Sequence, residues 1–548
     1  MKTVIVGGVA GGASAAARLR RLDEHARMIL FERGEHISFA NCGLPYYLSG
    51  VIENRDDLLL QTPKSFGGRF DVDVRVKSAV TAIDRAEKAV VVSGPDGIYR
   101  ESYDRLILSP GAEPIRPDIP GLDGPRVYTL RNVADAEVLR RMAERNTGQR
   151  AVIIGGGFIG LEVAENLVEA GLCVSLIEAA GHVLPPVDFD MAQDVHRHLV
   201  KKGVDLRLHT LVTAVDDEAD GPVTVRFKDG EPISCALVVL AIGVRPDSHL
   251  ASACGLETDE RGYILVDEHM RTSDQDIYAV GDAVKVRHFV TGQPVGIPLA
   301  GPANRQGRIA ADNIAGRPSV YKGTQGSGIV KVFDLTVCFT GVSEEAANMW
   351  KLDVDKVFLW LPSHATYYPG AKNMSMKIIF EKSSGRILGA QIVGRDGADK
   401  RMDVLAAAIR HRLTASDLTE LELCYAPPYS SAKDPVNMAG FAVMNVLEGL
   451  VRQFHWHDVA DLPRDGSVTL LDVRTDSEYA AGHIPGFIHV PLDSLREHLQ
   501  QLDKSKPVYL YCFSGMRSYV ACRILSGHGY DCYNLAGGWR LYESAVLG

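Results

Sequence analysis

The chain carries one local pattern twice, and this repeat limits the folds open to it. Residues 2–22, KTVIVGGVAGGASAAARLRRL, and residues 150–171, RAVIIGGGFIGLEVAENLVEAG, each join a β-branched run to a glycine turn and a helical pattern. A second apolar run follows each copy and ends in an acid, first Glu32 and then Glu178. In such β-α-β units a pyrophosphate lies at the helix start, and the acid accepts hydrogen bonds from ribose hydroxyls. The repeat therefore predicts an α/β protein with two dinucleotide-binding units.

The two glycine turns differ in completeness. The second has all three glycines of the G-x-G-x-x-G pattern, namely Gly155, Gly157 and Gly160. The first keeps Gly7 and Gly12, with valine at the middle position. A single copy is a weak signal, because ordinary glycine-rich turns look the same. Two copies with acids at the expected distance make the prediction specific.

Composition narrows the class of protein. The 548 residues correspond to about three to four domains. A net charge of −10 argues against a general nucleic-acid binder. The nine cysteines show no zinc spacing, so we expect no metal and mostly reduced thiols in a cytoplasmic protein. No uncharged apolar run approaches the ~18 residues needed to span a bilayer, and the first glycine turn speaks against a signal peptide.

A single cysteine, Cys42, lies in the segment SFANCGLPYY at residues 38–47. One thiol cannot store two electrons as an internal disulfide. It can form a mixed disulfide with an outside thiol, be oxidised to a sulfenic acid, or pack in the core. The segment is polar and bounded by glycine and proline, which favours a redox role over packing.

Two more stretches extend the pattern, namely YDRLILSPGAEPIRPDIPG at 103–121 and TSDQDIYAVGDAV at 272–284. With them, residues 1 to about 450 resemble the two-dinucleotide flavoproteins of the pyridine nucleotide–disulfide reductase family. The resemblance implies FAD in the first unit and NAD in the second. It also gives Asp282, which follows Gly281, a contact with the flavin ribityl chain.

Within that family, SFANCGLPYY most resembles the coenzyme A disulfide reductase branch. There the cysteine forms a mixed disulfide with coenzyme A, and Ser38 and Asn41 match the polar positions of the motif. The resemblance also brings Tyr367 in HATYYPG and Tyr425 in CYAPPYSSAKDP to the sulfur site of the other subunit of a homodimer. A tyrosine hydroxyl there could protonate a leaving thiolate. Simple packing is the alternative for both tyrosines.

Coenzyme A is anionic, and the chain offers cations and polar groups for it. Arg18 and Arg21 lie three residues apart on one face of the first helical pattern. The segment LLLQTPKSFGGRF adds Gln61, Thr62 and Arg69. For each cation the alternative is a solvated surface charge. For the hydride donor, Glu178 is followed by AAGHV without an arginine, which favours NADH over NADPH.

The last hundred residues carry motifs of a different kind. SVTLLDVRTDSEYAAGHIPGFIHVPL at 467–492, PVYLYCFSGMRS at 507–518 and YNLAGGW at 533–539 resemble a rhodanese domain. The resemblance makes Cys512 a carrier of sulfane sulfur. The loop from Cys512 to Arg517 would aim backbone N–H groups at the sulfur, and Arg517 would add positive charge. An inactive rhodanese-like module is the alternative.

The predicted fold class is α/β, with two Rossmann-like domains, an α+β dimerisation domain and an α/β rhodanese domain. The FAD-binding domain would comprise residues 1–115 and 245–320, with the NAD-binding domain inserted at 116–244. The dimerisation domain would span 321–450 and the rhodanese domain 455–548. The link between these last two is not rich in Gly or Ser, which favours fixed docking.

These expectations combine into one leading hypothesis and two alternatives. The first is an NADH-dependent persulfide or polysulfide reductase with FAD and coenzyme A, which releases sulfide. The second is a coenzyme A disulfide reductase that maintains the thiol pool. The third is a redox-sensing scaffold whose rhodanese module docks partners. For the leading hypothesis the expected partners are small sulfur compounds and a second copy of the chain, with neither nucleic acid nor membrane.

Overall fold

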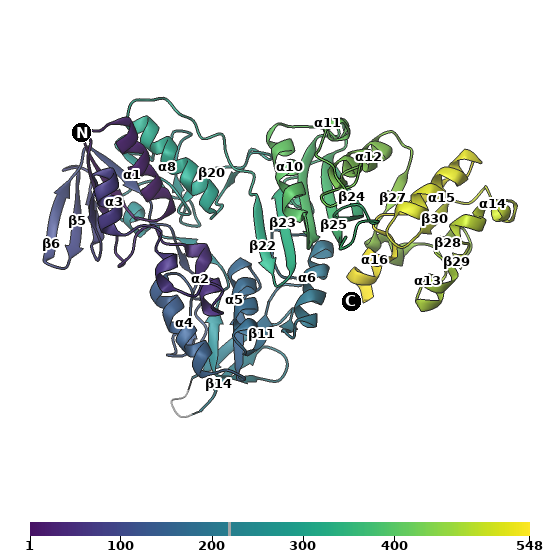
Figure 1. The fold of residues 1–548 in the computed structure, drawn as a ribbon, viewed down its shortest axis with the longest axis horizontal. Helices are drawn as coiled ribbons and strands as arrows, with labels where there is room; N and C mark the ends of the chain where they lie inside the picture. The colour runs from purple at the N-terminus through teal and green to yellow at the C-terminus, as the bar shows by residue number, and fades with distance from the viewer. Residues whose placement is uncertain (218–220, 548) are drawn as a thin grey trace. The chain divides into compact units, whose positions relative to one another are not determined.

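The computed structural model describes residues 1–217 and 221–547. They form two compact units (Figure 1), one of residues 1–183 and 203–326 and the other of residues 184–202 and 327 onward. Residues 184–202, which lie inside the predicted NAD-binding range, thus belong to the second unit. The predicted α/β class is confirmed.

The first sheet of the first unit is parallel and has the order β19-β7-β1-β2-β3. β1 and β2 are apolar runs buried beyond their first residue, as in strands covered on both faces. α1 packs on β1 and β2, and α8 packs on α1 (Figure 1). The elements are β1 (Lys2–Val6), α1 (Ala10–Leu22), β2 (Arg27–Phe31), α2 (Leu44–Leu48), α3 (Pro63–Phe70), β3 (Asp73–Arg75), β7 (Arg105–Leu108), β19 (Ile277–Ala279) and α8 (Ala300–Ile314).

Small sheets and one short helix surround this core. An antiparallel sheet has the order β4-β5-β6, β17 pairs with β8, and β20 lies between β18 and β21. The bounds are β4 (Ala79–Asp84), β5 (Ala89–Gly94), β6 (Gly97–Ser102), β8 (Ala112–Pro114), β17 (Val244–Pro246), α7 (His249–Ala253), β18 (Ile264–Leu265), β20 (Val284–Arg287) and β21 (Pro294–Val295).

The second parallel sheet repeats the plan of the first, in the order β12-β11-β10-β16-β9. α2, which follows Cys42, packs on α4 and α5 beside this sheet. An antiparallel sheet of β13, β14 and β15 completes the region. The bounds are β9 (Val127–Tyr128), α4 (Val133–Arg145), β10 (Arg150–Ile154), α5 (Phe158–Glu169), β11 (Cys173–Ile177), β12 (Asp205–Arg207), β13 (Val212–Asp216), β14 (Val223–Phe227), β15 (Ile233–Cys235) and β16 (Leu237–Leu240).

The second unit opens with an antiparallel sheet of order β22-β23-β26-β25-β24. Helix α6 packs on it and is fixed by the fully buried Lys377, whose ammonium contacts Asp188, Asp190 and Glu344 at 2.8–3.0 Å. The bounds are α6 (Phe189–Lys201), β22 (Gly328–Val332), β23 (Leu335–Gly341), α9 (Glu344–Met349), β24 (Val354–Pro362), β25 (Asn373–Glu381), β26 (Ile387–Gly394), α10 (Ala398–Arg410), α11 (Ala415–Glu420) and α12 (Pro435–Leu447).

The chain ends in a parallel sheet of order β27-β31-β30-β28-β29. The buried Asp472 pairs with Arg474 at 2.7 Å and accepts the Tyr511 hydroxyl at 2.6 Å, which locks the DVR motif to the sheet. The bounds are β27 (Arg452–Phe454), β28 (Thr469–Asp472), α13 (Asp476–Ala481), β29 (Ile488–His489), α14 (Leu495–His498), β30 (Val508–Tyr511), α15 (Met516–Gly527), β31 (Cys532–Leu535) and α16 (Gly538–Tyr542).

No helix in the described ranges is both long enough and apolar enough to cross a membrane.

Candidate active site

The two acids of the repeated pattern occupy equivalent positions. Glu32 accepts the backbone N–H of Gly8 at 3.0 Å and that of Gly34 at 2.8 Å. Glu178 accepts the N–H of Gly156, in the second glycine turn, at 2.7 Å. A carboxylate has about four lone-pair sites, so each acid keeps acceptor capacity for ribose hydroxyls. The geometry suits the predicted role at both copies.

Close backbone contacts require the last glycine of each turn. A Cβ on Gly12 would lie 1.9 Å from the carbonyl oxygen of Gly7, and one on Gly160 would lie 1.9 Å from that of Gly155. A Cβ on Gly157 would meet nothing within 4 Å, so this side of the turn is open. Neither α1 nor α5 has a side-chain hydrogen bond at its N-cap, as is common for helix starts that bind an anion. These residues fit the pyrophosphates of FAD and NADH.

Gly281 and Asp282 follow β19, at the carboxyl end of the first sheet. Gly281 has φ +86° and donates its N–H to the Gln306 side chain at 2.7 Å. Burial raises the pKa of Asp282, and Arg131 partly offsets this effect. A carboxylate in this position can accept hydroxyl hydrogen bonds, as the ribityl prediction requires.

Cys42 lies on a short 3₁₀ turn, Asn41–Gly43, and its side chain is exposed. The Ser38 N–H donates to the carbonyl of Gly8 at 2.8 Å, so the Cys42 segment is tied directly to the first glycine turn. Within the described residues, the Asn41 side-chain oxygen is buried and accepts no hydrogen bond. An orphaned acceptor beside the thiol fits a bound group that brings a donor.

The surroundings of Cys42 disfavour its thiolate. Partial burial raises the pKa of the Cys42 thiol, and the carboxylates of Glu162 and Asp282 raise it further. A negative thiolate is therefore costly here, whereas a neutral mixed disulfide is not.

Two side-chain hydrogen bonds anchor the segment that follows Cys42 to α5, and the sequence did not predict them. Tyr46 donates a hydrogen bond to Glu162, and Ser49 donates to Asn166 at 2.5 Å. Burial raises the pKa of Glu162 to about 7, and the nearby Glu165 carboxylate adds to the rise. The available signal was three polar residues at i, i+3 and i+4 within an otherwise apolar helix.

The candidate cations for coenzyme A divide into two kinds. Arg18 is paired with Asp312 of α8 at 2.7 Å, and both side chains are mostly buried. Its charge is therefore compensated within the protein, and its expected contact with coenzyme A stays a prediction. Arg21 and Arg69 are exposed.

The two polar candidates near α3 already have local partners. Thr62 caps the helix and accepts the Ser65 N–H at 3.0 Å, and the Ser65 hydroxyl donates back to Gln61 at 3.1 Å. Both residues thus help to form the helix start, which accounts for their presence without a ligand.

The two predicted tyrosines come together in the second unit. Their hydroxyl oxygens lie 2.9 Å apart, although 58 residues separate them. Tyr367 is 75% exposed and Tyr425 is 47% exposed. The hydrogen bond to Tyr425 raises the pKa of Tyr367. The chain therefore does not use this pair as packing within its own core.

A buried arginine brings the tyrosine loops together. Arg401 of α10 donates to the Ser363 carbonyl at 2.8 Å and pairs with Asp434 at 2.9 Å. Ser363 precedes the loop of Tyr367, and Asp434 follows the loop of Tyr425. The sequence signal was a charged residue on the apolar stripe of α10, whose buried residues include Ala398, Met402 and Leu405.

Cys512 follows β30 and is 1% exposed. Its sulfur accepts the Gly515 N–H at 3.1 Å and the Ser518 hydroxyl at 3.2 Å. Both donors suit a sulfur anion. One is a backbone N–H of the predicted loop, whereas the Ser518 hydroxyl was not predicted. Arg517, however, is paired through both its terminal nitrogens with Glu478, at 2.6 and 2.7 Å. Its charge is thus shared between the Glu478 carboxylate and Cys512, which also interacts with it electrostatically. The expected role of Arg517 at the sulfur stays a prediction.

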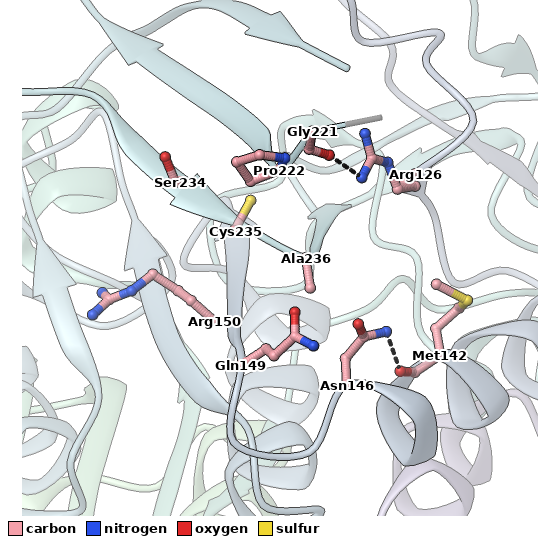
Figure 2. Close-up of a pocket in the computed structure, with 10 residues that line it drawn as sticks. All are labelled: Arg126, Met142, Asn146, Gln149, Arg150, Gly221, Pro222, Ser234, Cys235 and Ala236. Carbon is pink, nitrogen blue, oxygen red and sulfur yellow. Dashed lines mark hydrogen bonds between the residues drawn. The ribbon is translucent and has the colours of Figure 1, made fainter. Parts of the chain in front are cut away.

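A cavity of about 400 Å³ lies away from all these groups, at the amino ends of β10 and β16. Figure 2 shows Arg126 donating to the carbonyl of Gly221 at its rim. Arg150 also lines it and pairs with Asp205. Glu178 lies past the carboxyl end of β11, so the nucleotide edge of this sheet is the opposite one.

Comparison with known families accounts for most of the chain. Residues 1–307 match the profile "Pyridine nucleotide-disulphide oxidoreductase", 328–435 its "dimerisation domain", and 455–545 the "Rhodanese-like domain". This protein belongs to the pyridine nucleotide–disulfide oxidoreductase family. It is an FAD- and NAD(H)-dependent oxidoreductase that acts on sulfur groups, with a rhodanese-like domain at its C-terminal end.

Named relatives narrow the branch. The "Coenzyme A disulfide reductase" of Staphylococcus aureus is 36% identical over 443 residues, which are 80% of this chain and 99% of that protein. The crystal structure of reduced Bacillus anthracis CoADR-RHD covers 100% of this chain and 98% of its own, with 48% identity and a TM-score of 0.97. The NAD-dependent persulfide reductase of A. fulgidus covers 100% of both chains, with 36% identity and a TM-score of 0.92. The predicted branch is confirmed.

Proposed function

We propose that this protein is an NADH-dependent reductase of persulfides or polysulfides that uses Cys42 with coenzyme A and releases sulfide. One observation carries the proposal. The same chain holds an exposed redox thiol with no second cysteine in its motif and a buried Cys512 whose sulfur accepts two hydrogen bonds. The full-length likeness to an NAD-dependent persulfide reductase supports it.

FAD, when bound and reduced by NADH, would supply the electron pair for the sulfur at Cys42. The Cys42 thiolate first attacks the inner sulfur of a persulfide R–S–SH. An S–S bond forms between Cys42 and R–S, and HS⁻ leaves. Two electrons then cleave this mixed disulfide into the Cys42 thiolate and RS⁻. Glu162 and Asp282 favour the neutral mixed disulfide, because they disfavour negative charge at Cys42.

We assign the polar residues around Cys42 to coenzyme A. The unpartnered oxygen of Asn41 and the adjacent Ser38 turn would orient the thiol arm. The exposed Arg21 and Arg69 suit its phosphates, whereas Arg18, Gln61 and Thr62 would act with their existing partners. Mass spectrometry of the protein purified without reductant tests this assignment. We expect a coenzyme A adduct on Cys42, and an unmodified Cys42 thiol would argue against it.

The exposed tyrosine pair supports a homodimer with shared active sites. In this arrangement Tyr367 and Tyr425 of one subunit would donate to the sulfur at Cys42 of the other. Tyr367→Phe and Tyr425→Phe should slow the sulfur step severalfold in single turnovers and leave flavin reduction by NADH unchanged. Tyr429→Phe, an exposed tyrosine near the same loop, is the matched control. Equal behaviour of all three variants would contradict the shared site.

The alternative within the same branch is a coenzyme A disulfide reductase, the name carried by the S. aureus relatives. Those relatives match only 80% of this chain. Sulfide release under NADH, set against turnover of coenzyme A disulfide, separates the two. Faster turnover of coenzyme A disulfide than of its persulfide would favour the alternative. The cytoplasmic location stays a prediction.

A further inference from the structure

We propose that Arg540 is a positioning residue for the loop that carries Cys512. Through Arg540, α6 and β24 would set the reactivity of that thiol. The proposal rests on the proposed function, with Cys512 as the carrier of sulfane sulfur that the rhodanese resemblance implies. All the contacts that support it lie in the second unit.

The start of α16 is hydrogen-bonded directly to the loop from Cys512 to Arg517, which we call the sulfur loop. Trp539 donates its N–H to the carbonyl of Cys512 at 2.8 Å, and Arg540 donates its N–H to that of Phe513 at 2.9 Å. A Cβ at Gly538, where φ is +62°, would come within 2.5 Å of the Cys512 oxygen. The contact is thus backbone against backbone, and movement of α16 moves the loop.

The side chain of Arg540 fastens α16 to α6. Its guanidinium donates to both carboxylate oxygens of Asp194, each at 2.7 Å. Burial pushes the pKa of Asp194 upward, but the contacts with Arg540, Ser375 and Arg197 outweigh it and hold the pKa below its ordinary value. Removing Arg540 would leave this mostly buried carboxylate without its main partner.

The ring of Trp360, on β24, completes a closed set of contacts. The Arg540 guanidinium lies 5.4 Å from the centre of this ring. The Phe513 ring meets Trp360 edge-on, also at 5.4 Å. Phe513 is therefore held by the Arg540 backbone on one side and by the sheet on the other. Gln453 of β27 donates to the Lys356 carbonyl of β24 at 3.1 Å. The rhodanese-like domain therefore contacts the strand that carries Trp360.

This arrangement matters for the thiol because both donors to its sulfur belong to the same stretch of chain. The Gly515 N–H and the Ser518 hydroxyl reach Cys512 only while the loop keeps its shape. Hydrogen bonds weaken steeply as their angles open. A loop released from Arg540 would stabilise the thiolate, or the outer sulfur of a persulfide, less well.

The test uses the full-length, flavin-loaded protein with Arg540→Ala, Arg540→Lys and the isosteric Asp194→Asn. One measurement is the pH profile of Cys512 alkylation, resolved by peptide mass spectrometry. The other is sulfur transfer from thiosulfate to cyanide. We expect Arg540→Ala to raise the alkylation midpoint by about half to one pH unit. We also expect kcat of transfer to fall about tenfold with KM within about twofold, because the loop and not thiosulfate binding is altered.

Three comparisons make the result decisive. Arg540→Lys should recover part of the lost kcat. Asp194→Asn, which removes the charge that pairs with Arg540, should change the midpoint and kcat in the same direction as Arg540→Ala. Arg523→Ala is the control, because Arg523 links α15 to the Leu450 carbonyl and touches none of these groups. All variants should keep wild-type flavin reduction by NADH.

A wild-type midpoint and kcat in Arg540→Ala overturn the proposal. Should that variant fail to fold, a wild-type profile in Asp194→Asn overturns it equally. If wild type itself transfers no sulfur, the function proposed for Cys512 fails, and the alkylation midpoints alone decide the role of Arg540.

Discussion

The two sulfur sites handle a thiol in opposite ways. Cys42 lies on a short turn with its side chain partly exposed, and burial raises the pKa of its thiol, with a further rise from the carboxylates of Glu162 and Asp282. Cys512 is almost fully buried, and its sulfur accepts two hydrogen bonds from its own loop. The first site fits a neutral disulfide, and the second fits an anion. In the proposed function, the chain would transfer sulfur at Cys512 and electrons at Cys42.

The largest expected effect separates the sites at once. Cys42→Ser should lower NADH-dependent reduction of every disulfide or persulfide substrate by at least about a thousandfold, because no other residue forms the mixed disulfide. FAD should stay bound, since the glycine turn and Glu32 are intact. The assay is steady-state turnover beside the flavin absorbance spectrum. Wild-type-like turnover would remove Cys42 from the mechanism.

The reciprocal variant, Cys512→Ser, should lose sulfur transfer and keep NADH-dependent reduction of small persulfides. Thiosulfate-to-cyanide transfer should fall by about a thousandfold, because the sulfur carrier is lost. Reduction of a small soluble persulfide that reaches Cys42 unaided should stay within about twofold. Parallel assays of both reactions check this. If the variant matches wild type with every sulfur donor, the domain is better described as a docking module.

A third variant changes only the electron supply to Cys42. Glu178→Arg should shift the ratio of kcat/KM for NADH over NADPH by roughly ten- to a hundredfold toward NADPH, because a cation replaces the carboxylate that repels a 2′-phosphate. Sulfur transfer at Cys512 serves as the internal control and should not change. Equal kcat/KM for both nucleotides in the wild type would show that Glu178 does not select between them.

The anion cradle of Cys512 is tested by Ser518→Ala. The loss of one donor to the sulfur should raise the Cys512 alkylation midpoint by about half to one pH unit. The Cys42 midpoint should not move. Because Ser518 is fully buried, a thermal melt is needed to exclude loss of folding. An unchanged Cys512 midpoint in a folded variant would mean that the Gly515 N–H suffices.

The smallest effect concerns Glu162. Its pKa of about 7 lies above its ordinary value, so the folded protein holds this proton between pH 4.5 and about 7, where the unfolded chain has lost it. Stability therefore falls as pH rises through this window, and Glu162→Gln should flatten that slope. The variant should also lower the Cys42 alkylation midpoint by a few tenths of a pH unit, because a negative charge is removed. A midpoint that rises would contradict the electrostatic assignment.

Residues close in sequence were predictable, and their partners far along the chain were not. The contacts of Glu32 and Glu178 with the glycine turns follow from a motif contained in about 30 residues. The donors to Cys512 likewise lie within six residues of it. Such patterns can be recognised because the residues that make them lie close together in the sequence.

The contacts that the sequence did not indicate share one property. Asp312, which pairs with Arg18, lies 294 residues away along the chain, and Glu478, which pairs with Arg517, lies 39 residues upstream. Periodicity shows which face of a helix is buried but not which charge from another element meets it. The meeting of Tyr367 and Tyr425 came from the family resemblance, and Arg401, which arranges it, was missed for the same reason.

The contact between Arg540 and Asp194 bears on how such a chain could be cut and recombined. A chimera joined near residue 455 would inherit the whole rhodanese-like sheet but take Asp194 and Trp360 from a different parent. The new parent would then place other side chains under the sulfur loop. Exchanging modules between relatives should therefore work best when residues 194, 360 and 540 travel together. The set of residues that must be exchanged together to preserve the surroundings of Cys512 thus extends beyond the rhodanese-like domain.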